Sequence, residues 1–293
     1  MNEIVFAPYH DRWLKKTVLK RLIWTAAGSC ALGGLYAWKF GEHWIRVERR
    51  DMRLSNLGKG FEGARIAHIS DLHCSPIVLQ KYLRHCVEEI NGLHPDFVVM
   101  TGDFITGHKQ YARRVAAVLK HLRPKVASLA VLGNHDYGIF HPRGLGGARG
   151  LAEYLSGLLM QANVQVTLND CRAFTRDGDW VQFVGVEDLW SPRFNPFQAF
   201  AGARGDAPTI ALCHNPDAAP QLARGGAQWT LAGHTHGTGL PEVVLPSDHP
   251  QFLAGQYDLG NDHWLYVNRG IGYGRRRNLN CRPEITLFTL RCA

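Results

Sequence analysis

The sequence predicts an α/β protein in which sheets are flanked by helices. Short apolar runs typical of buried strands alternate with segments whose apolar residues recur at helical spacing, as in residues 77–91. Acidic, amide or histidine residues directly follow five of the apolar runs. In the second half, strand-like runs succeed one another, and an Asp-Gly turn at 177–178 separates two of them. We therefore expect sheet of antiparallel character to be added there.

The composition is that of a folded protein. The chain has 293 residues, of which 45% are hydrophobic and 20% charged, so one large or two small domains are expected. Its formal charge of +8 fits a solvated or membrane-facing surface, or attraction to phosphorylated substrates and anionic lipid. No nucleic-acid motif is found, so no nucleic-acid partner is expected. The seven cysteines are dispersed without Cys-x-x-Cys spacing, which predicts reduced thiols.

The N-terminal part of the chain predicts a basic segment, an anchor and a linker. Residues 1–21 are polar and increasingly basic, whereas residues 22–38 carry no charge and have aromatic residues near both ends. This run is at the short limit for a bilayer, so we expect an anchor that spans the membrane or lies in its interface. A buried or surface amphipathic helix, or a signal-peptide core, is the alternative. Residues 39–63 predict a linker with one short strand, before a domain at 64–293.

The expected anchor makes the protein membrane-associated, with a single N-terminal attachment to the inner or cytoplasmic membrane. Basic residues flank the apolar run on both sides, so the positive-inside rule does not choose an orientation. The side of the membrane on which the domain lies is therefore left open. The oligomeric state is left open as well.

Within the domain, strands and helices are expected in a regular order. In the first half, strands and helices alternate, with strands at 65–70, 96–101 and 126–132 and helices at 77–91, 111–122 and 151–162. The second half is richer in strands, which are expected at 164–168, 171–176, 180–186, 209–213, 229–232, 264–268 and 284–290.

Five polar motifs follow these strands and carry the chemistry. In chain order they are Asp71-Leu72-His73, Gly102-Asp103, Gly133-Asn134-His135-Asp136, His214, and Gly233-His234-Thr235-His236-Gly237. Carboxylate oxygens together with imidazole nitrogens suit hard and borderline divalent metals. Each motif alone is a weak signal, but all five in order, each after an apolar run, predict a metal site at the strand ends.

This ordered set of motifs resembles the calcineurin-like metallophosphoesterase family, from about residue 65 to the C-terminus. The membrane-anchored bacterial YkuE-type branch is the most similar, because the segments 267–270 (Val-Asn-Arg-Gly) and 281–285 (Cys-Arg-Pro-Glu-Ile) also resemble it. The resemblance implies a four-layer α-β-β-α sandwich, in which two mixed sheets pack between helices. Where relatives often continue Gly-Gly-Gln, this chain departs from the branch with Gly-Thr-Gly-Leu-Pro at 237–241.

The resemblance also implies a metal ligand set. It comprises the bridging Asp103, then Asp71, His73 and His236 on a first ion, and Asn134, His214 and His234 on a second ion. Two divalent ions are expected, Mn²⁺ in the first place, with Fe²⁺ or Zn²⁺ as alternatives. Two ions held close together can clamp the attacking and leaving oxygens of a phosphoryl centre.

Catalytic and substrate-binding roles follow from the same resemblance. His135 is expected to donate a proton to the leaving oxygen or to stabilise charge as a cation, and Asp136 to orient it. Asn134, His135 and Arg269 are expected to contact the substrate, with a structural salt bridge as the alternative for Arg269. The implied reaction is in-line hydrolysis of a phosphodiester or pyrophosphate by a metal-bridging hydroxide, without a covalent enzyme intermediate.

The expected function is thus a membrane-anchored, metal-dependent phosphoesterase acting on a phosphorylated small molecule or lipid. Relatives with this layout include hydrolases of UDP-2,3-diacylglucosamine, which would explain both the anchor and the basic surface. A general phosphodiesterase or phosphomonoesterase of the cell envelope is the alternative among enzymes. A non-catalytic metal-binding scaffold or a basic membrane-surface adaptor are alternatives of other classes. Scaffolds usually lack a ligand or the histidine at 135, and here the set is complete.

Overall fold

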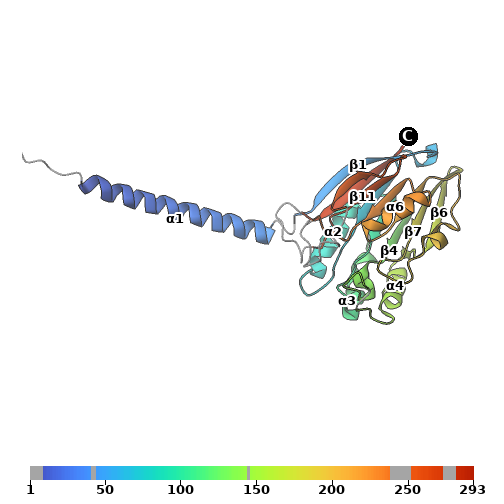
Figure 1. Cartoon of the computed structure of the whole chain (residues 1–293), viewed down its shortest axis with the longest axis horizontal. Coiled ribbons are helices and arrows are strands. Elements are labelled where there is room, and N and C mark those ends of the chain that lie inside the picture. The colour runs from blue at the N-terminus through green and yellow to red at the C-terminus, as the bar shows by residue number, and fades with distance from the viewer. Residues whose placement is uncertain (1–8, 41–43, 144–145, 238–251, 273–281) are drawn as a thin grey trace, which may run out of the picture. The chain divides into compact units, whose positions relative to one another are not determined.

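The computed structural model describes residues 9–40, 44–143, 146–237, 252–272 and 282–293. The chain divides into two compact units, Met1–Glu42 and His43–Ala293. The first unit contains one continuous helix, α1 (Tyr9–Phe40), which includes the predicted anchor (Figure 1). Among the helices of the described residues, none is both long enough and apolar enough to cross a membrane. The anchoring role of residues 22–38 stays a prediction.

The second unit is built on two six-stranded sheets. The first sheet has the order β1 (Arg46–Leu54), β12 (Glu284–Cys292), β2 (Arg65–Ile69), β3 (Phe97–Thr101), β4 (Ala127–Val131) and β5 (Val164–Val166). The second has the order β10 (Gly255–Asp258), β11 (Trp264–Val267), β9 (Trp229–Ala232), β8 (Thr209–Leu212), β7 (Asp179–Gly185) and β6 (Asp170–Arg176). Each sheet contains four adjacent parallel strands, β2 to β5 in one and β11, β9, β8 and β7 in the other.

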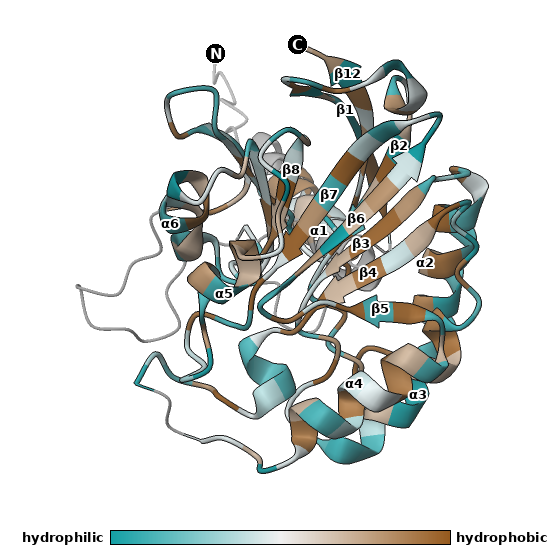
Figure 2. Ribbon diagram, turned by 90° about the vertical axis from the view of Figure 1, so that its right-hand side faces the viewer, coloured by the Kyte–Doolittle hydropathy of each residue, from teal (hydrophilic) through white to brown (hydrophobic). Residues whose placement is uncertain are grey.

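Helices cover the outer faces of the two sheets. One apolar cluster joins the first sheet to α2 (Gln80–Gly92), α3 (Lys109–Leu119) and α4 (Leu151–Gln161). Another joins the second sheet to α5 (Pro196–Phe200) and α6 (Ala219–Arg224). A third lies between the sheets and includes Phe97 and Val99 from one and Phe183 and Ile210 from the other. Figure 2 shows these apolar strands between the helices. The predicted mixed α/β fold with two sheets is confirmed.

Local sequence explains the strand pattern. All five residues of β3 are buried, as are all five of β4, because helices cover one face and the second sheet the other. Such strands read as continuous apolar runs, which is why they were predictable. At the predicted Asp-Gly turn, Asp177 and Gly178 both have positive φ, 55° and 85°, which matches the twist of a two-residue hairpin loop between β6 and β7.

Residues 39–63 are predicted as a linker, but from residue 44 onward they belong to the folded unit. All nine residues of β1 pair in parallel with β12. Met52, Leu54 and Phe61 are buried in the cluster between the sheets. β1 lies at the edge of its sheet and carries charged residues on its exposed positions, as edge strands commonly do. These charges mask its apolar alternation in the sequence.

Truncating Leu54 should therefore destabilise the fold. This side chain is 1% exposed, so Leu54→Ala is expected to cost about 2–5 kcal/mol of unfolding free energy. Denaturant unfolding followed by tryptophan fluorescence would measure the loss. Arg53→Ala is the matched control, since Arg53 is exposed on the opposite face of β1 and its truncation should cost less than about 0.5 kcal/mol. Equal losses for the two variants would contradict the packing of β1 against the core.

The predicted departure at residues 238–241 and the first residues of the basic segment, 1–8, lie outside the described residues. Among the described strands and α-helices, β10, α5 and α6 fall in stretches for which no element is predicted. They are short, and each covers or extends the second sheet.

Candidate metal centre

The predicted ligands lie in loops that directly follow five parallel strands. These loops follow β2 (Asp71 and His73), β3 (Asp103), β4 (Asn134), β8 (His214) and β9 (His234 and His236). Parallel strands end at the same edge of a sheet, which is where α/β proteins form their sites. The edges of both sheets contribute, so ligands far apart in sequence meet in one place.

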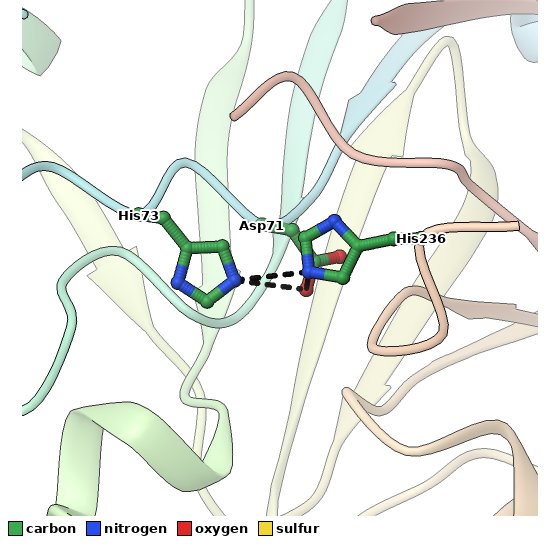
Figure 3. Close-up of side chains that lie close together, drawn as sticks. All are labelled: Asp71, His73 and His236. Carbon is green, nitrogen blue, oxygen red and sulfur yellow. Dashed lines mark hydrogen bonds and ion pairs between the residues drawn. The ribbon is translucent and has the colours of Figure 1, made fainter. Parts of the chain in front are cut away.

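The first group of ligands consists of Asp71, His73 and His236. The Nε2 atoms of the two histidines are 3.0 Å apart. Asp71 Oδ1 lies 3.7 Å from His73 Nε2 and 3.4 Å from His236 Nε2. Figure 3 shows the two rings and the carboxylate converging from two separate loops. Each residue thus offers one donor atom to a common point.

Asp103 connects this first group to a second group. Its Oδ2 atom lies 3.5 Å from His73 Nε2 and 3.3 Å from His214 Nε2. His214 Nε2 is in turn 3.2 Å from His234 Nδ1. One carboxylate oxygen therefore faces imidazoles of both groups, which fits the bridging position predicted for Asp103.

Asn134 lies in the short helix η3 (Asn134–Tyr137), immediately after β4. Its Nδ2 donates to the carbonyl of Ile139 at 2.7 Å, which turns the amide oxygen away from that bond. Within the described residues, Asn134 Oδ1 and Asp71 Oδ1 are buried and accept no hydrogen bond. An unsatisfied buried acceptor costs about 1–3 kcal/mol, and a bound cation would remove that cost.

The donor set as a whole therefore fits two divalent cations. Carboxylate and amide oxygens lie beside four imidazoles, a mixture suited to Mn²⁺, Fe²⁺ and Zn²⁺. The Nε2 atoms of His73 and His236 and the Oδ1 atom of Asp71 lie within 3.7 Å of one another, as ligands of a common ion would. We assign the site to metal on this chemistry, and the identity of the ion stays a prediction.

Burial and the carboxylates set the protonation of these groups. Burial lowers the pKa of His73 to about 3 and, together with nearby His214, holds that of His234 well below its usual value. Neutral imidazole is the form that binds metal. Burial alone would lower the pKa of His214, but the charges of Asp103 and Asp71 raise it well above normal. Burial likewise would raise the pKa of Asp103, and His214 holds it well below normal.

The backbone of the site is strained. Five predicted ligands have positive φ, namely Asp71 (52°), His73 (47°), Asp103 (55°), His234 (76°) and His236 (52°). Residues other than glycine seldom adopt this conformation, and it persists where surrounding contacts enforce it. The amide of His234 donates to Asp71 Oδ2 at 3.0 Å, which ties the two loops together. At Gly233, a Cβ atom would lie 1.8 Å from Ser70 Oγ, so only glycine permits this approach.

His135 lies beside the centre, with its Nε2 3.9 Å from Asp103 Oδ2. Its backbone N–H donates to Asp103 Oδ1 at 3.0 Å, and its ring contacts the His73 ring edge-on, with centroids 5.1 Å apart. The Asp136 carboxylate accepts from the amides of Ile105 and Gly133, at 3.1 and 2.9 Å, and so joins the loops after β3 and β4. Its role in orienting His135 stays a prediction.

Comparison with known proteins identifies the family. A sequence model of the family described as calcineurin-like phosphoesterase matches residues 64–238. The chain belongs to this family. It is accordingly a hydrolase that acts on phosphoester bonds.

Three relatives resemble the chain along most of its length. The uncharacterized metallophosphoesterase YkuE of Bacillus subtilis is 30% identical, over 91% of this chain and 93% of the relative. The UDP-2,3-diacylglucosamine pyrophosphatase LpxG of Chlamydia muridarum is 26% identical, over 85% and 89%. The phosphodiesterase YaeI of Escherichia coli is 28% identical, over 77% and 82%. The predicted membership of a YkuE-type group of calcineurin-like phosphoesterases is thus confirmed.

Arg269, predicted to contact substrate, forms ion pairs in this structure. Its Nη1 donates to Glu284 Oε2 at 2.8 Å and lies 3.8 Å from Glu48 Oε1. The salt bridge considered as its alternative role is therefore present. A contact with substrate stays a prediction for this member of the family.

Sequence reasoning missed residues that follow β7 and surround the second ligand group. Trp190 contacts the His234 ring edge-on, with centroids 4.9 Å apart. Asp188 is buried, and burial raises the pKa of its carboxyl to about 6. Glu187 accepts a hydrogen bond from the hydroxyl of Tyr137 in η3. Acidic residues directly after an apolar strand are the same signal that marks the five motifs, so the sequence offered a means of finding them.

Proposed function

We propose that this chain hydrolyses a phosphodiester or pyrophosphate bond with the help of two divalent metal ions, on a lipid-linked substrate such as UDP-2,3-diacylglucosamine. The observation that carries the proposal is the position of Asp103. One of its carboxylate oxygens, Oδ2, faces imidazoles of both ligand groups. Similarity to LpxG supports the pyrophosphate and the lipid, whereas similarity to YaeI supports a general phosphodiesterase as the alternative.

The residues of the site have distinct tasks in such a reaction. Bound divalent ions would supply Lewis acidity and lower the pKa of a bound water. Asp71, Asp103 and the four histidine ligands would hold these ions in place, and their positive charge would attract a phosphate group to this edge of the sheets. His135 lies next to the centre without an assigned ligand role, and its ring can donate a proton to the leaving oxygen or stabilise charge on the phosphoryl group in the transition state. Asn134 is expected to contact the substrate as well as an ion.

An exposed aromatic side chain beside the centre, and two exposed apolar side chains in the loop after His73, support a lipid-linked substrate. Phe140 is 50% exposed and contacts the His135 ring, with centroids 4.8 Å apart. Ile77 and Leu79, which lie in the loop between His73 and α2, are 60% and 55% exposed. An apolar margin beside a polar centre suits a substrate with a phosphate head and acyl chains.

Membrane association is part of the proposal. α1 exposes several large apolar side chains, namely Val18, Leu19, Leu22, Ile23, Trp24 and Leu32. Together with the charge-free run at residues 22–38 and the basic residues before it, these side chains are suited to contact with lipid. The side of the membrane on which the domain lies decides whether the enzyme can reach a nucleotide-linked lipid.

The metal requirement tests the reaction class. The purified full chain, loaded with Mn²⁺, should hydrolyse bis(p-nitrophenyl) phosphate, and removal of metal with a chelator should lower the rate by about a thousandfold or more, because a metal Lewis acid is worth several kcal/mol. Added Mn²⁺ should restore the rate. Chelator already saturated with Mn²⁺ is the control for side effects of the reagent. An unchanged rate after removal of metal would refute the proposed chemistry.

The substrate arm of the same experiment compares UDP-2,3-diacylglucosamine with UDP-glucose, which has the same pyrophosphate but no acyl chains. Hydrolysis of either pyrophosphate yields two monophosphates, so release of UMP measures both. A clear preference for the acylated substrate is expected. Equal rates on the two substrates would favour the general phosphodiesterase.

A further inference from the structure

Glu284, the first residue of β12, lies at the centre of a buried polar cluster. Its side chain is inaccessible to solvent. Glu284 Oε1 accepts hydrogen bonds from the hydroxyls of Tyr266 and Thr286, both at 2.7 Å, and Oε2 accepts from Arg269 at 2.8 Å. Asn268 Nδ2 lies 3.4 Å from Oε1. Every one of these partners is a donor, which matches a carboxylate because it only accepts.

This cluster fixes the turn that follows β11. Asn268 Nδ2 donates to Thr286 Oγ1 at 2.9 Å, and Asn268 Oδ1 accepts from the amide of Gly270 at 2.7 Å. The backbone N–H of Glu284 donates to the carbonyl of Gly270 at 3.0 Å. Glu284 thus holds Asn268 through its side chain and Gly270 through its backbone.

The same turn packs directly on the loop that carries Asp71. The amide of Ile271 donates to the carbonyl of Ser70 at 2.9 Å, and the amide of Gly272 donates to that of Asp71 at 2.8 Å. A Cβ atom at Gly270 would lie 2.6 Å from Asp71 Cβ, and Gly270 has a φ of 78°. Only glycine fits this contact. The turn therefore supports Asp71 in its strained conformation, with a φ of 52°.

We propose that Glu284 is a positioning residue, which acts through the turn at 268–272 to hold Asp71 toward the first metal ion. The inference rests on the proposed function, because it concerns how tightly that ion is bound. The second group of ligands has supports of its own. Asn134 donates to the carbonyl of Ile139 and His214 Nδ1 contacts that of Thr101, each at 2.7 Å. Disturbing Glu284 should thus affect one ion more than the other.

Glu284→Gln is the appropriate substitution because it keeps the shape of the side chain. The amide keeps one acceptor oxygen but replaces the other by an NH₂ donor and removes the charge. It must therefore either face Arg269 with a donor or leave the hydroxyl hydrogens of Tyr266 and Thr286 without the acceptor they have in Glu284. Supporting residues of metal sites typically contribute 10- to 100-fold to affinity. We expect the binding of one Mn²⁺ ion to weaken about 10-fold or more, and that of the other to change less than about twofold.

Equilibrium dialysis of the metal-stripped full chain against Mn²⁺ would measure both affinities without relying on activity. Combining E284Q with His73→Ala shows which of the two ions is bound less tightly in E284Q. Since His73→Ala already removes a ligand of the first ion, E284Q should cause no further loss in that background. Thr286→Val, which removes one donor to Glu284, should weaken the same ion by a smaller factor. This variant keeps the test available if E284Q does not fold.

Asp96→Asn is the matched control. Asp96 is also a buried carboxylate with an arginine partner, Arg176, at 3.0 Å, and it accepts the amide of Arg65 at 2.8 Å. It precedes β3, at the opposite end of the strand from Asp103. Loss of a buried charge is common to the two variants, but only E284Q should weaken one ion selectively.

Three outcomes would count against the inference. Wild-type affinities for both ions in E284Q and Thr286→Val would overturn it while leaving the proposed function intact. If E284Q lowered the affinities for both ions equally, and Asp96→Asn did the same, Glu284 would contribute only to general stability. Failure of the wild-type chain to take up Mn²⁺ would refute the proposed function, and the inference with it.

Discussion

Replacement of Asp103 by asparagine is expected to release both metal ions and to lower turnover by about a thousandfold or more. The Oδ1 atom of this side chain accepts the amide of His135, a bond that asparagine can keep with its own oxygen. The asparagine NH₂ group then replaces Oδ2, which faces His214 at 3.3 Å and His73 at 3.5 Å. An uncharged NH₂ group, which cannot bind a cation, thus occupies the one position shared by the two ligand groups.

Metal analysis of the dialysed full chain would measure the effect, alongside turnover of bis(p-nitrophenyl) phosphate. Asp96→Asn again serves as control, because Asp96 is buried but lies at the other end of β3, and it should retain the metal. Asp103→Asn should fold, since the two side chains have the same shape. Full metal occupancy in Asp103→Asn would contradict a bridging role for this carboxylate.

The central strands could be predicted from the sequence, as could the edge strands β5 and β6, whereas the extent of the edge strand β1 could not. β3 and β4 are buried on both faces and therefore form nearly continuous apolar runs, interrupted only by Thr101 and Ser128. β1 has the opposite character, because its exposed positions carry Arg49, Arg50 and Asp51. In a single sequence such a segment looks like a charged linker. Its partner β12 lies more than two hundred residues away, so no local signal records the pairing.

In the candidate site, too, some residues could be predicted from the sequence and others could not. Asp71, Asp103 and His214 each follow a buried strand directly, so the local sequence and the rule for parallel strands suffice to bring them together. The role of Arg269 could not be decided, since its partners Glu48 and Glu284 come from β1 and β12. Their meeting depends on the register of two strands from opposite ends of the domain. Supporting contacts of this kind are a property of the tertiary fold.

Replacement of His135 by alanine is expected to lower turnover by about 10²- to 10⁴-fold while leaving the metal in place. The bond from residue 135 to Asp103 uses the backbone N–H, so alanine retains it and the ligand loop should keep its conformation. His141→Ala is the matched control, because His141 is an exposed histidine a few residues further along the chain. The turnover of the His141→Ala variant should stay within about twofold of that of the wild type.

Metal analysis of His135→Ala would separate a catalytic role from a ligand role. The ring nitrogen of His135 lies 3.9 Å from Asp103 Oδ2, and together with His73 these residues form a group that could itself hold an ion. Loss of one metal ion from the variant would make His135 a ligand, and its assignment as proton donor would be wrong.

With the metal retained, the leaving group decides between the two catalytic roles of His135. A proton donor matters most when the leaving oxygen is strongly basic, because an alkoxide departs with difficulty unless it is protonated. p-Nitrophenolate is a weak base and needs little help. If His135 donates a proton, His135→Ala should therefore lose more activity on an alkyl phosphodiester than on bis(p-nitrophenyl) phosphate. If it stabilises charge on the phosphoryl group, the two losses should be similar, since both substrates develop that charge.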